Sequence, residues 1–292
     1  GRIVALRCHD GISGQSGGDS FLTSAFTREK GLKDIRDVEL FLFDLDGTVY
    51  VGDKEIEGSF AAINRLRALG KRVCFFTNNS SRKHTDYIER LKRLGLEVTA
   101  DEVYTSGQVT CEYLLEHHTG KKVLLLGNDR LKAEFAEYGI ETVETHPDIA
   151  VIAFDTSLTY EKLYSFCRWV QEDIPYFATH PDNFCPAEVC PMPDVGALTE
   201  AVRLTVGRSP DLVMGKPFAA AGERIAKRFG LPPEKIAMVG DRLYTDIAFG
   251  VNCGFVSVLV LTGETDRAMA EKSDIKADIV LGAVKDIPAL VE

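Results

Sequence analysis

The sequence predicts an α/β protein with a doubly wound parallel sheet and a second, inserted α/β domain. From Leu40 onward, short continuous apolar runs alternate with amphipathic stretches. Continuous apolar runs are typical of strands buried on both faces, and such strands occur in parallel sheets that helices cover on both sides. With 292 residues and 45% hydrophobic content, the chain has enough material for a large core.

The apolar runs give the expected strands in chain order. Between them, residues 82–96, 159–173 and 216–230 repeat apolar residues at three- and four-residue spacing, and a glycine often follows. This pattern predicts amphipathic helices, so the chain alternates strand and helix. The expected strands are Leu40–Phe43, Arg72–Phe76, Lys122–Leu126, Ala150–Phe154, Tyr176–Ala178, Leu212–Met214, Lys235–Val239 and Val256–Leu261.

The first 38 residues lack this alternation and include the segment "GISGQSGGDS". Such a composition cannot bury much apolar surface, so we expect residues 1–38 to be a flexible extension or a segment added by cloning. An h-region of a secretory signal needs roughly 7 to 15 apolar residues, and Ile3 to Leu6 is far shorter.

The composition narrows the classes of partner and compartment. The formal net charge of -10 and the pI of about 5.2 argue against a protein that binds nucleic acid or an anionic membrane through its overall field. No apolar stretch approaches the roughly 20 residues of a membrane-spanning helix. Seven cysteines without a CxxC pair are typical of reduced thiols, which favours a cytoplasmic protein over a disulfide framework or a zinc site.

Polar residues accumulate where predicted strands end. In a parallel sheet the ligand lies at the carboxyl ends of the strands, so these residues are expected to meet in one crevice. Carboxylates with a lysine and small donors suit a phosphate bound together with a hard cation such as Mg²⁺. One Asp-x-Asp-Gly segment alone is equally typical of a surface turn, but four such strand ends favour a site. The residues are Asp44, Asp46, Gly47 and Thr48; Thr77, Asn78 and Asn79; Gly215, Lys216 and Pro217; Gly240, Asp241, Arg242, Thr245 and Asp246.

Four segments, "DLDGT", "FFTNN", "GKP" and "GDRLYTDI", resemble in order and placement the four motifs of the haloacid dehalogenase (HAD) superfamily. The segments "FFTNNS", "VYTSGQ", "FATHPD" and "VMGKP" narrow the resemblance to the 4-nitrophenyl phosphatases, a subfamily that includes NagD-type nucleotide phosphatases and phosphoglycolate phosphatases. The resemblance implies a HAD fold, in which residues 39–106 and 210–292 form a Rossmann-like catalytic core. Residues 107–209 would form the inserted α/β cap.

The resemblance implies an Mg²⁺-dependent phosphomonoesterase that hydrolyses a small soluble phosphate ester through an aspartyl-phosphate. Asp44 resembles the nucleophile and Asp46 the general acid/base, which protonates the leaving oxygen and then activates water. An acid at residue 46 favours phosphatases and phosphomutases over the pumps of this superfamily, which carry threonine there. The implied substrate-binding residues are Thr77, Asn78, Asn79 and Lys216; the implied metal ligands are Asp44, the carbonyl of Asp46 and Asp241; and Asp246 orients this group.

Substrate specificity is expected to reside in the cap, because the core residues all bind phosphate and metal. The loop after the strand at Tyr176–Ala178 carries His180, Asp182 and Asn183, and it reads Thr-His-Pro-Asp where relatives usually read Thr-Asn-Pro-Asp. We therefore predict that His180 contacts the substrate. The alternative is an ordinary loop in which His180 is a surface imidazole.

Two other functions stay open at this point. A phosphomutase or phosphotransferase uses the same aspartyl-phosphate and passes it to a sugar hydroxyl instead of water. A catalytically silent α/β binding protein keeps the fold alone, although the joint presence of Asp44, Asp46, Lys216 and Asp241 speaks against it. The sequence identifies neither the natural phosphate ester nor the oligomeric state, so a homodimer is left open.

Overall fold

The computed structural model describes residues 34–187 and 189–292. Most of the extension predicted at residues 1–38 lies outside these residues. Its last part does not behave as an extension, because Ile35 is 7% exposed and Val38 is fully buried in the core. Both side chains are apolar, and they pack beneath the sheet that begins at Leu40. The packed chain therefore begins before residue 39.

The larger sheet has six parallel strands. From β1 the chain winds outward in both directions, to β4 and β5 on one side and to β12, β13 and β14 on the other. This is the doubly wound arrangement that the sequence predicts. In spatial order the strands are β14 (Ile279–Leu281), β13 (Val256–Val260), β12 (Ile236–Gly240), β1 (Leu40–Phe43), β4 (Arg72–Thr77) and β5 (Val103–Thr105).

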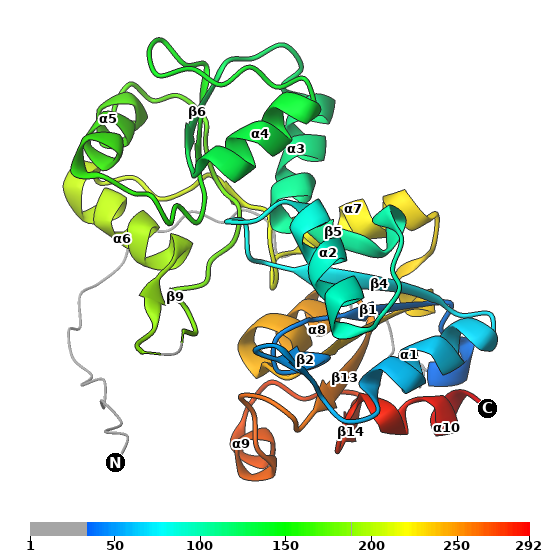
Figure 1. Cartoon of the computed structure of the whole chain (residues 1–292). Helices are drawn as coiled ribbons and strands as arrows, with labels where there is room; N and C mark the ends of the chain where they lie inside the picture. Colours follow the sequence, from blue (N-terminus) through cyan, green and yellow to red (C-terminus); the bar gives the residue numbers. More distant parts are fainter. Residues whose placement is uncertain (1–33, 188) are drawn as a thin grey trace. The chain divides into compact units, whose positions relative to one another are not determined.

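Helices cover both faces of this sheet (Figure 1). Successive side chains of a strand point to opposite faces, so Phe41 and Phe43 pack on one side while Leu40 and Leu42 pack on the other. All four are fully buried, which is why β1 reads as a continuous apolar run. The first face carries α1 (Ser59–Ala68), α2 (His84–Leu94) and α10 (Pro288–Val291), and the second carries α3 (Ser106–His117), α7 (Ala219–Phe229) and α8 (Ala248–Cys253).

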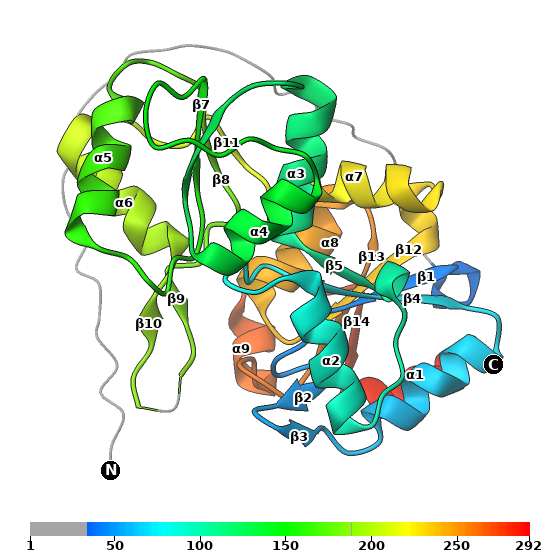
Figure 2. The same ribbon diagram turned by 45° about the horizontal axis from the view of Figure 1, so that its top comes forward.

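A second parallel sheet lies in the middle of the sequence (Figure 2). One of its faces packs on α5 and α6, and the other packs on α4 and α3. The predicted division at Ser209 assigns Leu212–Val213 to the catalytic core, but this strand pairs with Tyr176–Ala178 of the second sheet. The boundary near Gly107 stays a prediction. The elements are β11 (Leu212–Val213), β8 (Tyr176–Ala178), β7 (Ile149–Ile152), β6 (Val123–Leu126), α4 (Asp129–Glu137), α5 (Tyr160–Val170) and α6 (Val195–Val206).

Several short elements are absent from the sequence-based expectation. The edge strands β5 and β14 have only three residues each, too few to show a pattern. Two hairpins have two-residue strands, which are also too short to show a pattern in the sequence. They are β2 (Tyr50–Val51) with β3 (Lys54–Glu55) and β9 (Phe184–Cys185) with β10 (Met192–Pro193), and the remaining helix is α9 (Arg267–Lys272).

The predicted fold class, α/β with parallel sheets and a cap, is confirmed. Across residues 34–187 and 189–292, every helix is too short or too polar to cross a membrane.

The central strand gives a stability prediction. Phe41 is fully buried and its ring lies 6.4 Å from that of Phe43, so Phe41→Ala leaves a cavity in the core. We expect it to lower the free energy of unfolding by about 3–5 kcal/mol. Val280→Ala, on edge strand β14 where the side chain is 42% exposed, is the control and should cost less than about 1 kcal/mol. Urea unfolding measures both, and equal losses would contradict the assigned packing.

Candidate active site

Asp44 is the first residue after β1, between the ends of β4 and β12. Its N–H donates to Val239 O at 2.9 Å, which continues the ladder with β12 and fixes where the side chain emerges. Gly47 then turns the chain with φ +86°, a conformation that favours glycine. Asp46 lies on this turn at the mouth of the pocket, where solvent reaches it. Desolvation by the surrounding walls nevertheless raises the pKa of its carboxyl to about 6.

Lys216 reaches this crevice from the second sheet, three residues beyond β11. Its Nζ lies 2.6 Å from Asp44 Oδ1 and 2.7 Å from Asp246 Oδ1, and it donates to Phe76 O at 3.2 Å. The side chain is only 2% exposed. Burial alone would lower the pKa of Lys216, but the carboxylates of Asp246 and Asp44 raise it above its ordinary value. The lysine is therefore a permanent cation between two acids.

Asp241 follows β12 and is almost fully buried. Its Oδ1 accepts from Thr48 Oγ1 at 3.0 Å, and its Oδ2 accepts from the Glu264 N–H at 2.7 Å. A Cβ added to Gly263 would lie 2.0 Å from this Oδ2, so only glycine leaves room for the carboxylate. Burial and the nearby charge of Asp44 raise the pKa of Asp241. The carboxylate of Asp241 is thus held rigidly in a buried environment that disfavours its ionised form.

Asp246 lies in a π-helical turn, Leu243–Ile247, that follows β12. One oxygen accepts from Lys216 Nζ, and the other accepts from the Arg242 N–H at 3.1 Å. Burial raises the pKa of Asp246 to about 7, although the charge of Lys216 opposes the shift. Because both oxygens are engaged, Asp246 is placed to orient Lys216, in agreement with the orienting role that the resemblance implies.

Three of these carboxylates fit a divalent cation. One oxygen each from Asp44, Asp241 and Asp246 lies within 4.8 Å of the others. Lys216 is the cation that contacts two of the three, so negative charge is in excess. The pKa of Asp241 is raised by burial and, to a smaller extent, by the nearby charge of Asp44. Mg²⁺ prefers carboxylate oxygens at an accessible site where it keeps several waters. The donor set therefore suits Mg²⁺.

The turn after β4 holds Thr77, Asn78 and Asn79, which all line the pocket. The Asn78 side chain is engaged elsewhere than on a phosphate: its Oδ1 accepts from the Lys216 N–H at 2.8 Å, and its Nδ2 donates to Lys216 O at 2.9 Å. The side chain of Asn79 accepts from Ser81 N at 2.9 Å and so shapes the turn. The structure thus gives the Asn78 side chain a positioning role toward Lys216, whereas Thr77 and Asn79 remain candidates to bind phosphate.

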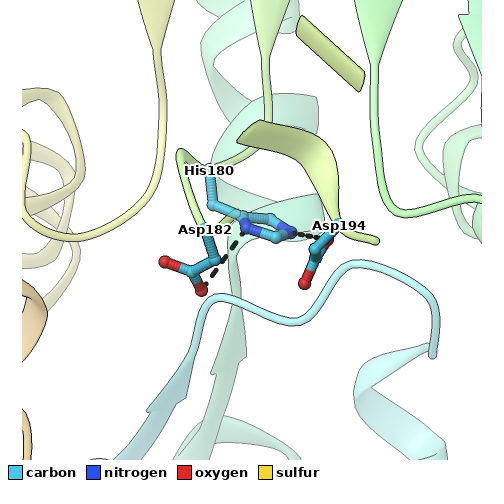
Figure 3. Close-up of side chains that lie close together, drawn as sticks. All are labelled: His180, Asp182 and Asp194. Carbon is cyan, nitrogen blue, oxygen red and sulfur yellow. Dashed lines mark ion pairs between the residues drawn. The ribbon is translucent and has the colours of Figure 1, made fainter. Parts of the chain in front are cut away.

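His180 is fully buried between two carboxylates of the second domain (Figure 3). Its Nδ1 lies 3.5 Å from Asp182 Oδ2, and its Nε2 lies 3.5 Å from Asp194 Oδ1. Burial alone would lower the pKa of His180, but the charges of Asp194 and Asp182 raise it. Because His180 is fully buried, the alternative of a surface imidazole is wrong. Asp182 and Asp194 line the pocket, and His180 is not among its lining residues. The predicted substrate contact by His180 finds no support in this placement.

The pocket joins the two groups of residues. It is lined on one side by the residues at the ends of the core strands and on the other by Asp182, Asp194 and the hairpin residues 184–186. Sequence reasoning missed Asp194, because an aspartate before a helix indicates an N-cap, and Asp194 does accept from the Val195 N–H at 2.7 Å. It also gave Arg242 no role, although this residue lines the pocket and lies 3.1 Å from Glu264.

Comparison with known proteins agrees with this geometry. The family model described as haloacid dehalogenase-like hydrolase matches residues 41–141, and a second, described as HAD-hydrolase-like, matches residues 213–287. A protein of Staphylococcus aureus named acid sugar phosphatase is 34% identical over 230 residues, which is 78% of this chain and 88% of that protein.

Solved structures are similar over most of the chain. A 4-nitrophenylphosphatase from Thermotoga maritima superposes with a TM-score of 0.86 at 41% identity, covering 88% of this chain and 99% of that one. A glycerol phosphate phosphatase from Mycobacterium tuberculosis, solved in complex with magnesium, has a TM-score of 0.80 at 28% identity, covering 88% of this chain and 78% of that one.

The position of Asn78 gives a prediction for stability. Asn78→Ala leaves the main-chain N–H and C=O of Lys216 buried without these partners, so it should lower the free energy of unfolding by about 2–4 kcal/mol. Asn64→Ala, on the exposed side of α1, is the control and should change it by less than about 0.5 kcal/mol. If chemical denaturation cannot distinguish the two variants, Asn78 does not hold Lys216 as described.

Proposed function

Since the chain belongs to the haloacid dehalogenase-like hydrolases and is a phosphatase of the NagD and 4-nitrophenyl phosphatase type, we propose that it hydrolyses small phosphate monoesters through a phosphoenzyme on Asp44. One observation carries this proposal: Asp44 lies 2.6 Å from the buried ammonium of Lys216, in a pocket that it shares with Asp46. A nucleophile, a positive charge and a proton carrier are thus gathered where a phosphate can enter.

The first step forms the phosphoenzyme. An oxygen of Asp44 attacks phosphorus, the bond between phosphorus and the ester oxygen breaks, and Asp46 gives its proton to that oxygen. Lys216 orients Asp44, since its ammonium contacts Asp44 and is itself fixed by Asp246. Thr77 and Asn79, at the end of β4, are the candidates to hold the phosphate oxygens.

The second step returns the enzyme to its initial state. Asp46, now a carboxylate, accepts a proton from water as the water attacks phosphorus, which releases inorganic phosphate and the free Asp44 carboxylate. A Mg²⁺ ion held by Asp44, the Asp46 carbonyl and Asp241 would offset the repulsion between the carboxylate and the phosphate. A phosphotransferase would pass the phosphoryl group to a hydroxyl instead, and product analysis with and without an added alcohol separates the two reactions.

We also propose a cytoplasmic location and a small-molecule phosphate ester as the partner. All cysteines in the described part of the chain are free thiols, which suits a reducing compartment. The net charge of -10 disfavours a nucleic-acid polymer or an anionic membrane as the partner.

Two variants test the roles of the aspartates. Asp44→Asn should lower kcat for 4-nitrophenyl phosphate by at least about 10³-fold, because it removes the nucleophile. Asp46→Asn should lower kcat for an unactivated alkyl phosphate by about 10²–10⁴-fold, a range typical of losing a general acid/base. Asp53→Asn, whose side chain is 77% exposed, is the control with unchanged kinetics. Near-normal turnover by Asp44→Asn rules out the proposed chemistry.

Metal removal gives an independent prediction. Dialysis against EDTA should abolish hydrolysis and Mg²⁺ should restore it. Excess Ca²⁺ should inhibit, because its longer bonds and looser coordination misplace the nucleophile and the phosphate. Asp241→Asn should raise the Mg²⁺ concentration for half-maximal activity by at least about tenfold. Full activity of a metal-free preparation, checked by elemental analysis, would mean that the carboxylate group does not bind a catalytic cation.

A further inference from the structure

The wall of the pocket opposite the nucleophile is acidic. Its charged residues are Asp182, from the loop after β8, and Asp194, at the start of α6. Lys216 and Arg242 also line the pocket, but Lys216 contacts Asp44 and Asp246, and Arg242 lies 3.1 Å from Glu264. The charges of Lys216 and Arg242 also act on Asp182 and Asp194, and they offset the negative charge of the opposite wall in part. The leaving group of a bound phosphate ester therefore faces these two carboxylates.

His180 holds these two carboxylates in place. It lies between them with each ring nitrogen 3.5 Å from one carboxylate oxygen (Figure 3). The ring is fully buried, and the carboxylates of Asp182 and Asp194 are the ionic partners of its two nitrogens. A buried imidazole flanked by two acids stabilises their negative charge. His180 is thus a positioning residue that acts through Asp182 and Asp194.

The two carboxylates differ in what they can still bind. Asp182 accepts from Asn78 Nδ2 at 3.2 Å with both oxygens, so it is tied to the turn that positions Lys216. Asp194 accepts from the Val195 N–H with Oδ1 alone. Within residues 34–187 and 189–292 no donor reaches its Oδ2, although Asp194 is only 3% exposed and lines the pocket. Because Asp194 lines the pocket, this oxygen is an acceptor that a ligand can reach.

Resting on the proposed phosphatase function, we propose that Asp194 is the specificity-determining residue of the cap. Its carboxylate accepts a hydrogen bond from a hydroxyl of an uncharged polyol or sugar leaving group. It repels a leaving group that carries a carboxylate or a second phosphate, because like charges facing one another across a desolvated contact are strongly unfavourable. Arg82, Arg90 and Arg130 line the wider groove outside this pocket.

A matched pair of substrates tests the proposal. Glycerol 3-phosphate and 3-phosphoglycerate differ only in that a carboxylate replaces a hydroxymethyl group. At pH 8 with Mg²⁺, the wild-type kcat/KM should be at least about tenfold higher for glycerol 3-phosphate, which corresponds to about 1.4 kcal/mol of transition-state binding. Asp194→Asn keeps the shape and the acceptor for Val195 but removes the charge, so it should reduce this ratio to within about twofold of unity.

Two further variants are measured with the same pair of substrates as Asp194→Asn. His180→Gln should move the ratio in the same direction as Asp194→Asn, whereas a loss of packing alone would lower both substrates together and leave the ratio unchanged. Asp173→Asn is the matched control, because this cap aspartate is 95% exposed at the side chain and does not line the pocket. Its ratio should equal that of the wild type.

The outcomes separate the two proposals. If the wild type hydrolyses 4-nitrophenyl phosphate but uses 3-phosphoglycerate as well as glycerol 3-phosphate, the role of Asp194 is wrong and the phosphatase function stands. An unchanged ratio in a folded Asp194→Asn variant overturns it too. If Asp194→Asn does not fold, the wild-type ratio still decides. If no ester is hydrolysed with Mg²⁺, the proposed function fails and this inference fails with it.

Discussion

The ion pair of Lys216 with Asp44 and Asp246 is the constraint on which the rest of the site depends. A buried ammonium is costly unless it is paired, and here two carboxylates lie 2.6 and 2.7 Å away. Each partner comes from a different part of the fold: Asp44 from β1, Asp246 from the turn after β12, and Lys216 from beyond the second sheet. The ion pair therefore requires the parallel order of the core strands and the return of the chain from the cap.

The same lysine connects the reaction centre to the cap. Its main chain is held by Asn78, and Asn78 also donates to Asp182 of the second domain at 3.2 Å. Asp182 in turn lies beside His180, so a short series of polar contacts runs from His180 in the cap to Lys216, which contacts Asp44. A substrate that binds in the pocket lies beside Asp182 and Lys216 of this series, which explains how the cap can affect a reaction that occurs on the core.

Much of this could be predicted from the sequence because the signals are local. Buried parallel strands read as apolar runs, and polar residues directly after them, such as Asp44 and Asp241, are at strand ends in the structure. The resemblance to NagD-type and 4-nitrophenyl phosphatases is confirmed by the comparisons. The features that could not be predicted depend on contacts between residues that are far apart in the sequence. The hydrogen bonds of Asn78, the pairing of β11 with β8 and the burial of His180 between Asp182 and Asp194 join residues whose proximity no local pattern shows.

The central claim is that Asp44 becomes phosphorylated during turnover. It is tested most directly by mixing the wild-type enzyme with a slow phosphate ester and Mg²⁺, quenching in acid within milliseconds, and mapping the peptides by mass spectrometry. The account predicts a phosphoryl group on Asp44, formed and lost at rates consistent with kcat. Steady release of inorganic phosphate with no phosphoryl group on Asp44, or with one on a different residue, would contradict it.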